Sequence, residues 1–235
     1  GVAWNAPVTL PGALAAAGYE TALVGRSMHQ WPPRKRYGYQ TMVIHGEDYE
    51  EFLRRNSPLD NPQWFGGGVM HNDWTARPWH LEESLHITNW TADEALRFLR
   101  RRDPSCPFFL TVSFVAPHPP LQPPAFYHER YLRTGVPDPS IGDWAGDPPG
   151  PADFTDTDFV APQRVHLQGE ALRSCRAAYY GLINHVDDQM RRLLNPVTGL
   201  PAMVGDNTII VFTSDHGEML GDHYLWRKSQ PYEPS

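Results

Sequence analysis

The chain has few cysteines, no excess of positive charge and no long apolar run. Cys106 and Cys175 are its two cysteines and neither belongs to a Cys-x-x-Cys pair, which excludes a disulfide framework and leaves a single bridge open. Twenty Lys and Arg residues against 27 Asp and Glu give a formal net charge of −7. This charge argues against nucleic acid as the main partner, because phosphate binding requires a basic surface. A membrane-spanning helix would need a run of about 18 apolar residues, and none occurs.

Proline, by contrast, is abundant, with 24 residues in a chain of 235. The prolines are interleaved with Trp, Phe and Tyr, so we expect long ordered connections rather than disorder. Residues 1–5 have neither the basic start nor the apolar stretch of a signal peptide, so the sequence leaves the compartment open. The first residue is not Met and a motif-rich segment runs almost to the last one. We therefore expect the chain to be part of a longer protein.

Apolar runs and helical periods alternate along the chain. Helices are expected over residues 9–18, 91–102 and 170–194, and strands over 21–24, 107–115 and 208–213. Residues 31–86 and 121–165 show no clear period, which predicts two long loops. Short, wholly apolar strands that alternate with helices indicate an α/β fold with a mostly parallel sheet and helices on both faces.

Polar side chains follow each of the three expected strands. Arg26 and His29 come after the first strand, His118 after the second, and Asp215 and His216 directly after the third. Ligands of parallel sheets bind beyond the carboxyl ends of the strands. The sequence therefore predicts that these side chains gather at one edge of the sheet.

Asp215 and His216 offer a carboxylate oxygen and an imidazole nitrogen to a divalent cation. Two adjacent ligands do not complete a site, so further oxygens would have to come from elsewhere. The alternative is that Asp215 caps the following segment and that His216 is merely exposed.

Two further side chains have a structural alternative beside the functional one. His118 stands between prolines that would hold it rigidly toward a substrate, or it simply packs in a proline-rich loop. Lys228 would ordinarily be a solvated surface lysine. No serine stands in a Gly-x-Ser-x-Gly turn, and no glycine-rich loop has the spacing of a nucleotide phosphate site.

Four segments together resemble the sulfatase family of the alkaline-phosphatase-like superfamily. The most specific is Ile210-Val-Phe-Thr-Ser-Asp-His-Gly-Glu-Met-Leu-Gly-Asp-His223 with Trp226-Arg-Lys228, which is similar to the family's metal and substrate segment. The other three, in the same order as in the family, are residues 18–26, 107–120 and 180–189. The resemblance implies an alkaline-phosphatase-like fold.

The resemblance also implies a role for each matching residue. Asp215 and His216 correspond to ligands of one divalent cation, calcium first, with magnesium or manganese as alternatives. Lys228 corresponds to the lysine that binds the sulfate oxygens and assists the leaving group, and His118 to the histidine that contacts the sulfate or leaving-group oxygen. Arg26 stands where the family has a substrate-binding lysine. His29 follows one position later than the family's histidine, since Met28 occupies that place.

Two parts of the family pattern do not occur in the sequence. One is Cys/Ser-x-Pro-x-Arg, whose Cys or Ser becomes the formylglycine nucleophile, and the other is the aspartate pair that completes the metal site. The resemblance places both upstream of the segment that matches residues 9–29. We therefore expect residues 1–235 to be part of one catalytic domain, without its N-terminal metal and nucleophile segment and without its C-terminal subdomain.

The function that the sequence favours is hydrolysis of a small-molecule or carbohydrate sulfate ester by a formylglycine nucleophile and one divalent cation. The chain by itself is expected to be inactive. One alternative is a phosphodiesterase or phosphonate monoester hydrolase of the same superfamily, and another is a non-catalytic relative that binds ligands. The sequence leaves the substrate, the ion and the oligomeric state open.

Overall fold

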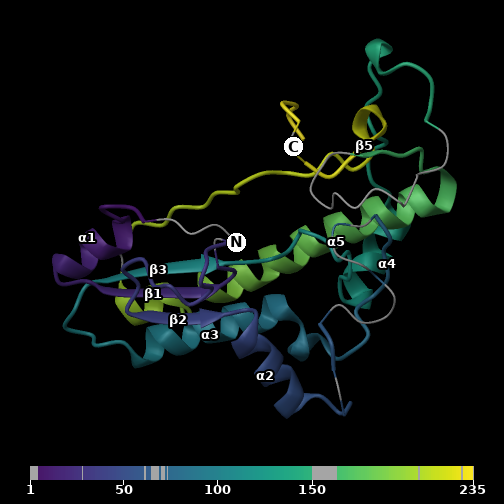
Figure 1. Ribbon diagram of the computed structural model, residues 1–235. Helices are drawn as coiled ribbons and strands as arrows, with labels where there is room; N and C mark the ends of the chain where they lie inside the picture. Colours follow the sequence, from purple (N-terminus) through teal and green to yellow (C-terminus); the bar gives the residue numbers. More distant parts are fainter. Residues whose placement is uncertain are drawn as a thin grey trace. The chain divides into compact units, whose positions relative to one another are not determined.

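A computed structural model describes residues 5–27, 29–60, 62–64, 69, 72, 74–149, 163–205, 207–228 and 230–234. These residues form two compact units (Figure 1). The first unit comprises residues 1–64, 81–115 and 186–209, and the second comprises residues 65–80, 116–185 and 210–235.

The first unit is built on a parallel three-stranded sheet. Its strands, in the spatial order β2-β1-β3, are β2 (Thr41–Ile44), β1 (Glu20–Gly25) and β3 (Phe108–Ser113). The side chains of Leu23 and Val24 point to opposite faces of β1, yet they are only 1% and 0% exposed. Both faces of the central strand are therefore covered, which explains why its sequence is a continuous apolar run. The expected α/β fold with a parallel sheet is confirmed.

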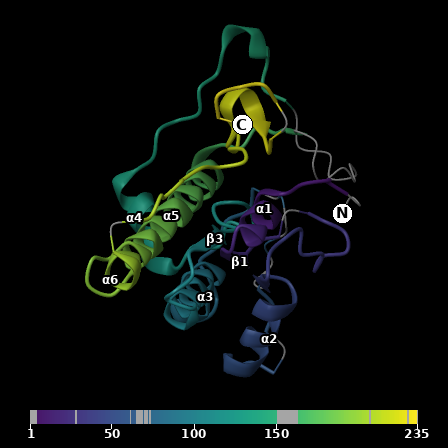
Figure 2. The same cartoon turned by 90° about the vertical axis from the view of Figure 1, so that its left-hand side faces the viewer.

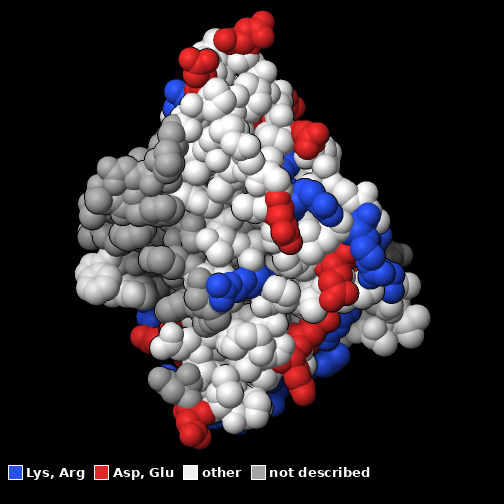
Figure 3. Space-filling model, turned by 90° about the vertical axis from the view of Figure 1, so that its right-hand side faces the viewer, with Lys and Arg blue, Asp and Glu red and all other residues white. Residues whose placement is uncertain are grey.

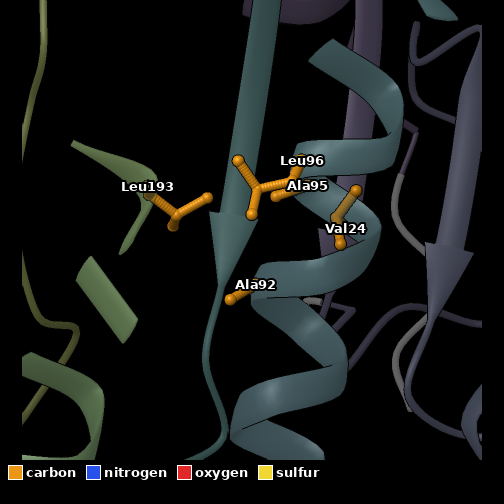
Figure 4. Packing of buried hydrophobic residues seen from close by; sticks show 5 residues of the cluster. All are labelled: Val24, Ala92, Ala95, Leu96 and Leu193. Carbon is orange, nitrogen blue, oxygen red and sulfur yellow. The ribbon is translucent and has the colours of Figure 1, made fainter. Parts of the chain in front are cut away.

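Of the four described helices of the first unit, the first three contact this sheet and the last contacts the third. They are α1 (Leu10–Ala16), α2 (Glu47–Asn56), α3 (Ile87–Arg101) and α6 (Leu200–Val204). Figure 2 shows α1 and α3 on opposite sides of β1. In the core under the sheet, Leu193 points toward Leu96 and Ala95 of α3, next to Val24 (Figure 4). The apolar stripe of α3 thus packs against both the sheet and Leu193, the last residue of the helix Gly169–Leu193.

The second unit contains the helix α4 (Ala125–Thr134) and most of α5 (Gly169–Leu193), a helix of 25 residues that continues into the first unit. A short antiparallel pair, β4 (Gln163–Arg164) and β5 (Leu225–Trp226), completes its regular structure together with 3-10 turns at Asp143–Ala145 and Asp222–Tyr224. A further 3-10 turn, Glu83–Leu85, precedes α3 in the first unit. Cys106 and Cys175 are both free thiols.

The expected strand over residues 208–213 is wrong. The segment is extended but pairs with no described strand, and Ile209, Val211 and Phe212 are 93%, 80% and 78% exposed. An apolar run becomes a strand only where another strand accepts its hydrogen bonds, and the described part of the chain offers this segment none. The prediction that polar groups follow three parallel strands therefore applies to two of the predicted strands, β1 and β3.

Other boundaries also differ from the expected ones. Helix α3 begins at Ile87 and not at Thr91, because the His86 imidazole Nδ1 accepts a hydrogen bond from the Thr88 backbone N–H and caps the helix. Thr91 lies inside the helix, where its hydroxyl donates to the Ile87 carbonyl. The two expected loops contain β2, α2 and α4, while residues 150–162 of the second loop lie outside the described residues.

No helix among the described residues is long and apolar enough to cross a membrane. On the face shown in Figure 3, basic and acidic side chains are intermixed. Neither observation changes the expectation of a small-molecule ligand.

The fold makes stability depend on pH through His185, which is fully buried in α5 and stacks on Tyr127 of α4 at 4.9 Å. Burial lowers the pKa of His185 from its ordinary 6.5 to about 4. The unfolded chain therefore takes up a proton between these two values that the folded chain does not. We expect the free energy of unfolding to be highest above pH 6.5 and to fall by up to about 3 kcal/mol as the pH drops to 4.

Urea unfolding at several pH values measures this loss. His185→Gln should flatten the dependence between pH 6.5 and 4, whereas His80→Gln, at an exposed histidine whose pKa burial also lowers, should change it less. An equal slope in wild type and His185→Gln would contradict the assignment.

Candidate active site

The segment from Asp215 to Lys228 folds back on itself. The Met219 backbone N–H donates to the Arg227 carbonyl at 2.9 Å, and the Gly221 N–H to the Leu225 carbonyl at 2.8 Å. The turn needs left-handed backbone at several positions, including Gly221 at φ 94°, where an added Cβ would press on the Trp226 ring at 3.3 Å. This returning loop brings the end that carries Lys228 back beside the Asp-His-Gly-Glu sequence.

Arg176 of α5 anchors the returning loop to the rest of the second unit. Its guanidinium donates to the Leu220 carbonyl at 2.8 Å and to the Pro137 carbonyl at 2.9 Å, and it lies 3.4 Å from the Asp222 carboxylate. The Arg176 side chain is only 8% exposed, so these contacts are shielded from water. The loop is thus fixed from within and from the helix behind it.

Lys228 lies among polar groups from three separate segments. Its Nζ is 2.7 Å from Nε2 of His118 and donates to Oδ1 of Asn72 at 3.1 Å. The other ring nitrogen of His118, Nδ1, is 2.6 Å from the Pro119 carbonyl, which requires the proton to be on Nδ1. Nε2 of His118 is therefore the acceptor, and the lysine ammonium is the donor.

His216 joins this group through its ring, whose centroid is 6.2 Å from that of His118. The Nδ1 of His216 is 2.7 Å from the Gly217 carbonyl, so Nδ1 carries the proton and Nε2 keeps a lone pair. The Asp215 carboxylate Oδ2 is 3.8 Å from that Nε2. Two atoms that each lie about 2.3 Å from one cation are separated by about 3.3 Å or more, so the pair fits two ligands of a single ion.

Among the residues that the structure describes, no three His, Cys, Asp or Glu side chains form a group that could hold a metal ion. In the described part of the chain Asp215 and His216 are therefore a pair of donors without a third. The Asp215 side chain is 71% exposed, which leaves its oxygens accessible to further coordination. Their role as metal ligands stays a prediction.

Glu218 is buried directly behind these groups. Burial raises the pKa of its carboxyl, while Lys228, a hydrogen bond from the Arg227 backbone N–H, and His216 act in the opposite direction. Glu218 is thus a buried acidic group that interacts electrostatically with Lys228 and His216. Sequence reasoning recorded Glu218 as part of the motif but gave it no role.

Arg26 and His29 belong to the first unit. The Arg26 guanidinium Nη2 is 2.7 Å from His29 Nε2, and the Arg26 backbone N–H donates to the Ser113 carbonyl at the end of β3. The two side chains therefore contact each other just beyond β1, in line with the expectation for that strand end. Met28 lies outside the described residues. The substrate-binding role of Arg26 and His29 stays a prediction.

Sequence reasoning missed Asn72 as a member of the site. It lies in the long segment that was expected to be a loop, and neither an apolar period nor a motif marks it. The contact with Lys228 is created by the tertiary fold, since 156 positions separate the two residues.

Comparison with known proteins supports the fold and then the family. A phosphonate monoester hydrolase from Agrobacterium radiobacter superposes on 99% of this chain and 52% of its own, with a TM-score of 0.72 and 23% identity, which defines the fold as that of this class of hydrolases. The chain belongs to the sulfatase family, which it matches over residues 2–235.

Two curated relatives are similar along nearly the whole chain. An arylsulfatase of Clostridium perfringens is 39% identical over 255 residues, covering 100% of this chain and 52% of the relative. A choline-sulfatase of Rhizobium meliloti is 28% identical, covering 94% of this chain and 44% of the relative. The chain spans about half the length of these relatives.

The anchoring role of Arg176 predicts a specific loss of stability. Arg176→Met leaves the carbonyls of Leu220 and Pro137 without a charged donor, and we expect the free energy of unfolding to fall by about 2–4 kcal/mol. Urea denaturation measures the change. Arg173→Met is the matched control on the same helix, because Arg173 is exposed, and it should cost less than about 1 kcal/mol. Equal losses in the two variants would contradict the anchoring role.

Proposed function

We propose that this chain provides the leaving-group clamp and half of the metal site of an enzyme that hydrolyses sulfate esters. The observation that carries the proposal is the contact of Lys228 Nζ with His118 Nε2 at 2.7 Å, with the His216 ring 6.2 Å from His118. A surface lysine needs no such partners. An ammonium held between an imidazole and an amide oxygen is instead suited to bind an anionic oxygen.

The chemistry of the ester explains why such a cluster is useful. As the bond between sulfur and the ester oxygen breaks, negative charge moves onto the leaving oxygen and the sulfate oxygens. Lys228 would oppose that charge from a fixed position, which lowers the barrier without reorganisation during the reaction. Lys228 has protons to share with the leaving oxygen, and His118 Nε2 holds the lysine in place.

Asp215 Oδ2 and His216 Nε2 would hold the divalent cation, for which calcium is the first choice and magnesium or manganese the alternatives. A bound cation supplies Lewis-acid stabilisation of a sulfate oxygen and helps orient the nucleophile. We propose that the remaining carboxylate ligands and the formylglycine nucleophile come from a segment that precedes these residues in the whole protein, since the sequence of this chain contains neither motif. Arg26 would bind substrate oxygens through its guanidinium donors, and His29, which contacts that guanidinium, would bind them beside it.

The names of the relatives support a sulfate ester as the substrate. The arylsulfatase of Clostridium perfringens is the more similar of the two curated relatives, at 39% identity. We therefore propose a small-molecule sulfate ester, aryl or carbohydrate, as the ligand. The structural likeness to a phosphonate monoester hydrolase concerns the fold, and phosphonate or phosphate diester hydrolysis is the competing outcome of the test.

Rates with matched esters test the reaction type. The whole protein, in its mature form and with calcium, should hydrolyse 4-nitrophenyl sulfate with a higher kcat/KM than 4-nitrophenyl phenylphosphonate or bis(4-nitrophenyl) phosphate. The 235-residue chain alone should release no 4-nitrophenolate, because it contains no nucleophile motif. A preference for the phosphorus esters would establish the competing reaction. Turnover by the 235-residue chain alone would refute the claim that the nucleophile lies outside it.

The clamp itself is tested at Lys228. We expect Lys228→Ala to lower kcat for 4-nitrophenyl sulfate by about 10²–10³-fold, the usual effect of removing one group that stabilises transition-state charge. Steady-state kinetics provide the measurement, and Lys35→Ala, at the other lysine of the chain, is the matched control. A loss shared equally by both variants would argue against a specific role of Lys228.

A further inference from the structure

Asn72 is held at the site by two consecutive basic residues of the returning loop. Its side-chain Oδ1 accepts a hydrogen bond from Lys228 Nζ at 3.1 Å, and its backbone carbonyl accepts one from Arg227 Nε at 2.9 Å. The loop therefore contacts both the main chain and the side chain of Asn72. Surface asparagines do not require such paired contacts.

Trp74, two positions after Asn72, contacts the same loop. Arg227 is 8% exposed and its guanidinium lies over the Trp74 ring at 5.9 Å, while Trp74 and Trp226 pack at 6.0 Å. Asn72 itself has left-handed backbone, φ 50°, which asparagine tolerates better than most residues. The loop that carries Arg227 and Lys228 therefore contacts both Asn72 and Trp74.

The consequence for Lys228 follows from the geometry of an ammonium group. Nζ has three N–H donors in a tetrahedral arrangement, and two of its contacts, Asn72 Oδ1 and His118 Nε2, come from separate segments of the second unit. Fixing two donors fixes the direction of the third. One acceptor alone would leave the ammonium free to rotate about that contact.

We propose that Asn72 is a positioning residue that holds the Lys228 ammonium in the direction of the ester oxygen. This inference rests on the proposed sulfate ester hydrolysis and adds a residue that neither the motifs nor the family resemblance assigned. Asn72 acts through Lys228 and adds no charge of its own. In the part of the chain that the structure describes, the charged or titratable groups near the lysine include His118, His216, Arg227 and Glu218.

Two substitutions distinguish the role of the Asn72 side-chain amide from that of its backbone carbonyl. Asn72→Gly removes the side chain, and glycine adopts the left-handed conformation without strain, so the carbonyl contact with Arg227 is kept. Asn72→Asp retains the shape and the acceptor oxygen but adds a negative charge beside Nζ. Asn56→Gly and Asn56→Asp, at the exposed end of α2, are the matched controls.

The composition of the chain permits a direct readout, because Lys35 and Lys228 are its two lysines. In the whole protein labelled with ¹³C,¹⁵N-lysine, NMR follows the side-chain titrations, and Lys35→Arg and Lys228→Arg assign the signals of these two lysines. Asn72→Asp should raise the titration midpoint of Lys228 by about one pH unit, and Asn72→Gly should lower it, since the amide oxygen favours the charged form. The Lys35 midpoint should not move, nor should either midpoint in the Asn56 variants.

Kinetics of the whole protein supply the second readout. Asn72→Gly should lower kcat by about 10–100-fold, the effect of a misplaced catalytic group, with KM changed less than kcat. The loss should be larger for phenyl sulfate than for 4-nitrophenyl sulfate, because the poorer leaving group depends more on Lys228.

The positioning role would be overturned by any of three results. The Lys228 titration midpoint does not move, it moves in the same direction in both Asn72 variants, or kcat falls equally for the two esters. Absence of any sulfate ester hydrolysis by the unmodified protein would instead refute the proposed function. The lysine titration would then still decide whether Asn72 controls Lys228.

Discussion

The site depends on the turn that returns the chain from Gly217 to Lys228. A segment of about a dozen residues reverses direction through left-handed backbone positions, and two main-chain hydrogen bonds, from Met219 and Gly221, close it. Such backbone is costly for residues other than glycine, so it persists only where surrounding contacts fix it. Those contacts come from Arg176 behind the loop and from Val165, whose carbonyl accepts a hydrogen bond from the Trp226 indole.

Charge is arranged around this turn with one buried carboxylate behind the basic groups. Glu218 lies under the loop, near Lys228 and the main chain of Arg227, while Asp215 is exposed at the other side of His216. A buried acid beside an ammonium keeps the local charge near balance and so reduces the cost of holding Lys228 in place before an anion binds. Both histidines bond backbone carbonyls through Nδ1, which leaves both Nε2 atoms with a lone pair. The arrangement suits an anion and a cation bound side by side.

The pattern of the sequence predicted the elements that have the strongest local signal. β1, β3 and α5 have either continuous apolar runs or a long helical period, and their boundaries lie within two residues of the expected ones. It failed at residues 208–213, where the same kind of apolar run is exposed and unpaired among the described residues. It also missed α2 and α4, short helices within the aromatic and proline-rich stretches.

The sequence by itself determined the kinds of chemistry available, because residue types and local spacing are properties of the chain. They are a histidine between prolines, the Asp-His pair, and a lysine about a dozen residues after that pair. Only the tertiary structure decided which of these groups meet. Lys228 and His118 are 110 positions apart, and Asn72 is more distant still, so their contacts depend on how loops pack, which no local pattern encodes. Local patterns report the forces between neighbours in sequence, whereas a site of this kind is assembled by side-chain packing between remote segments.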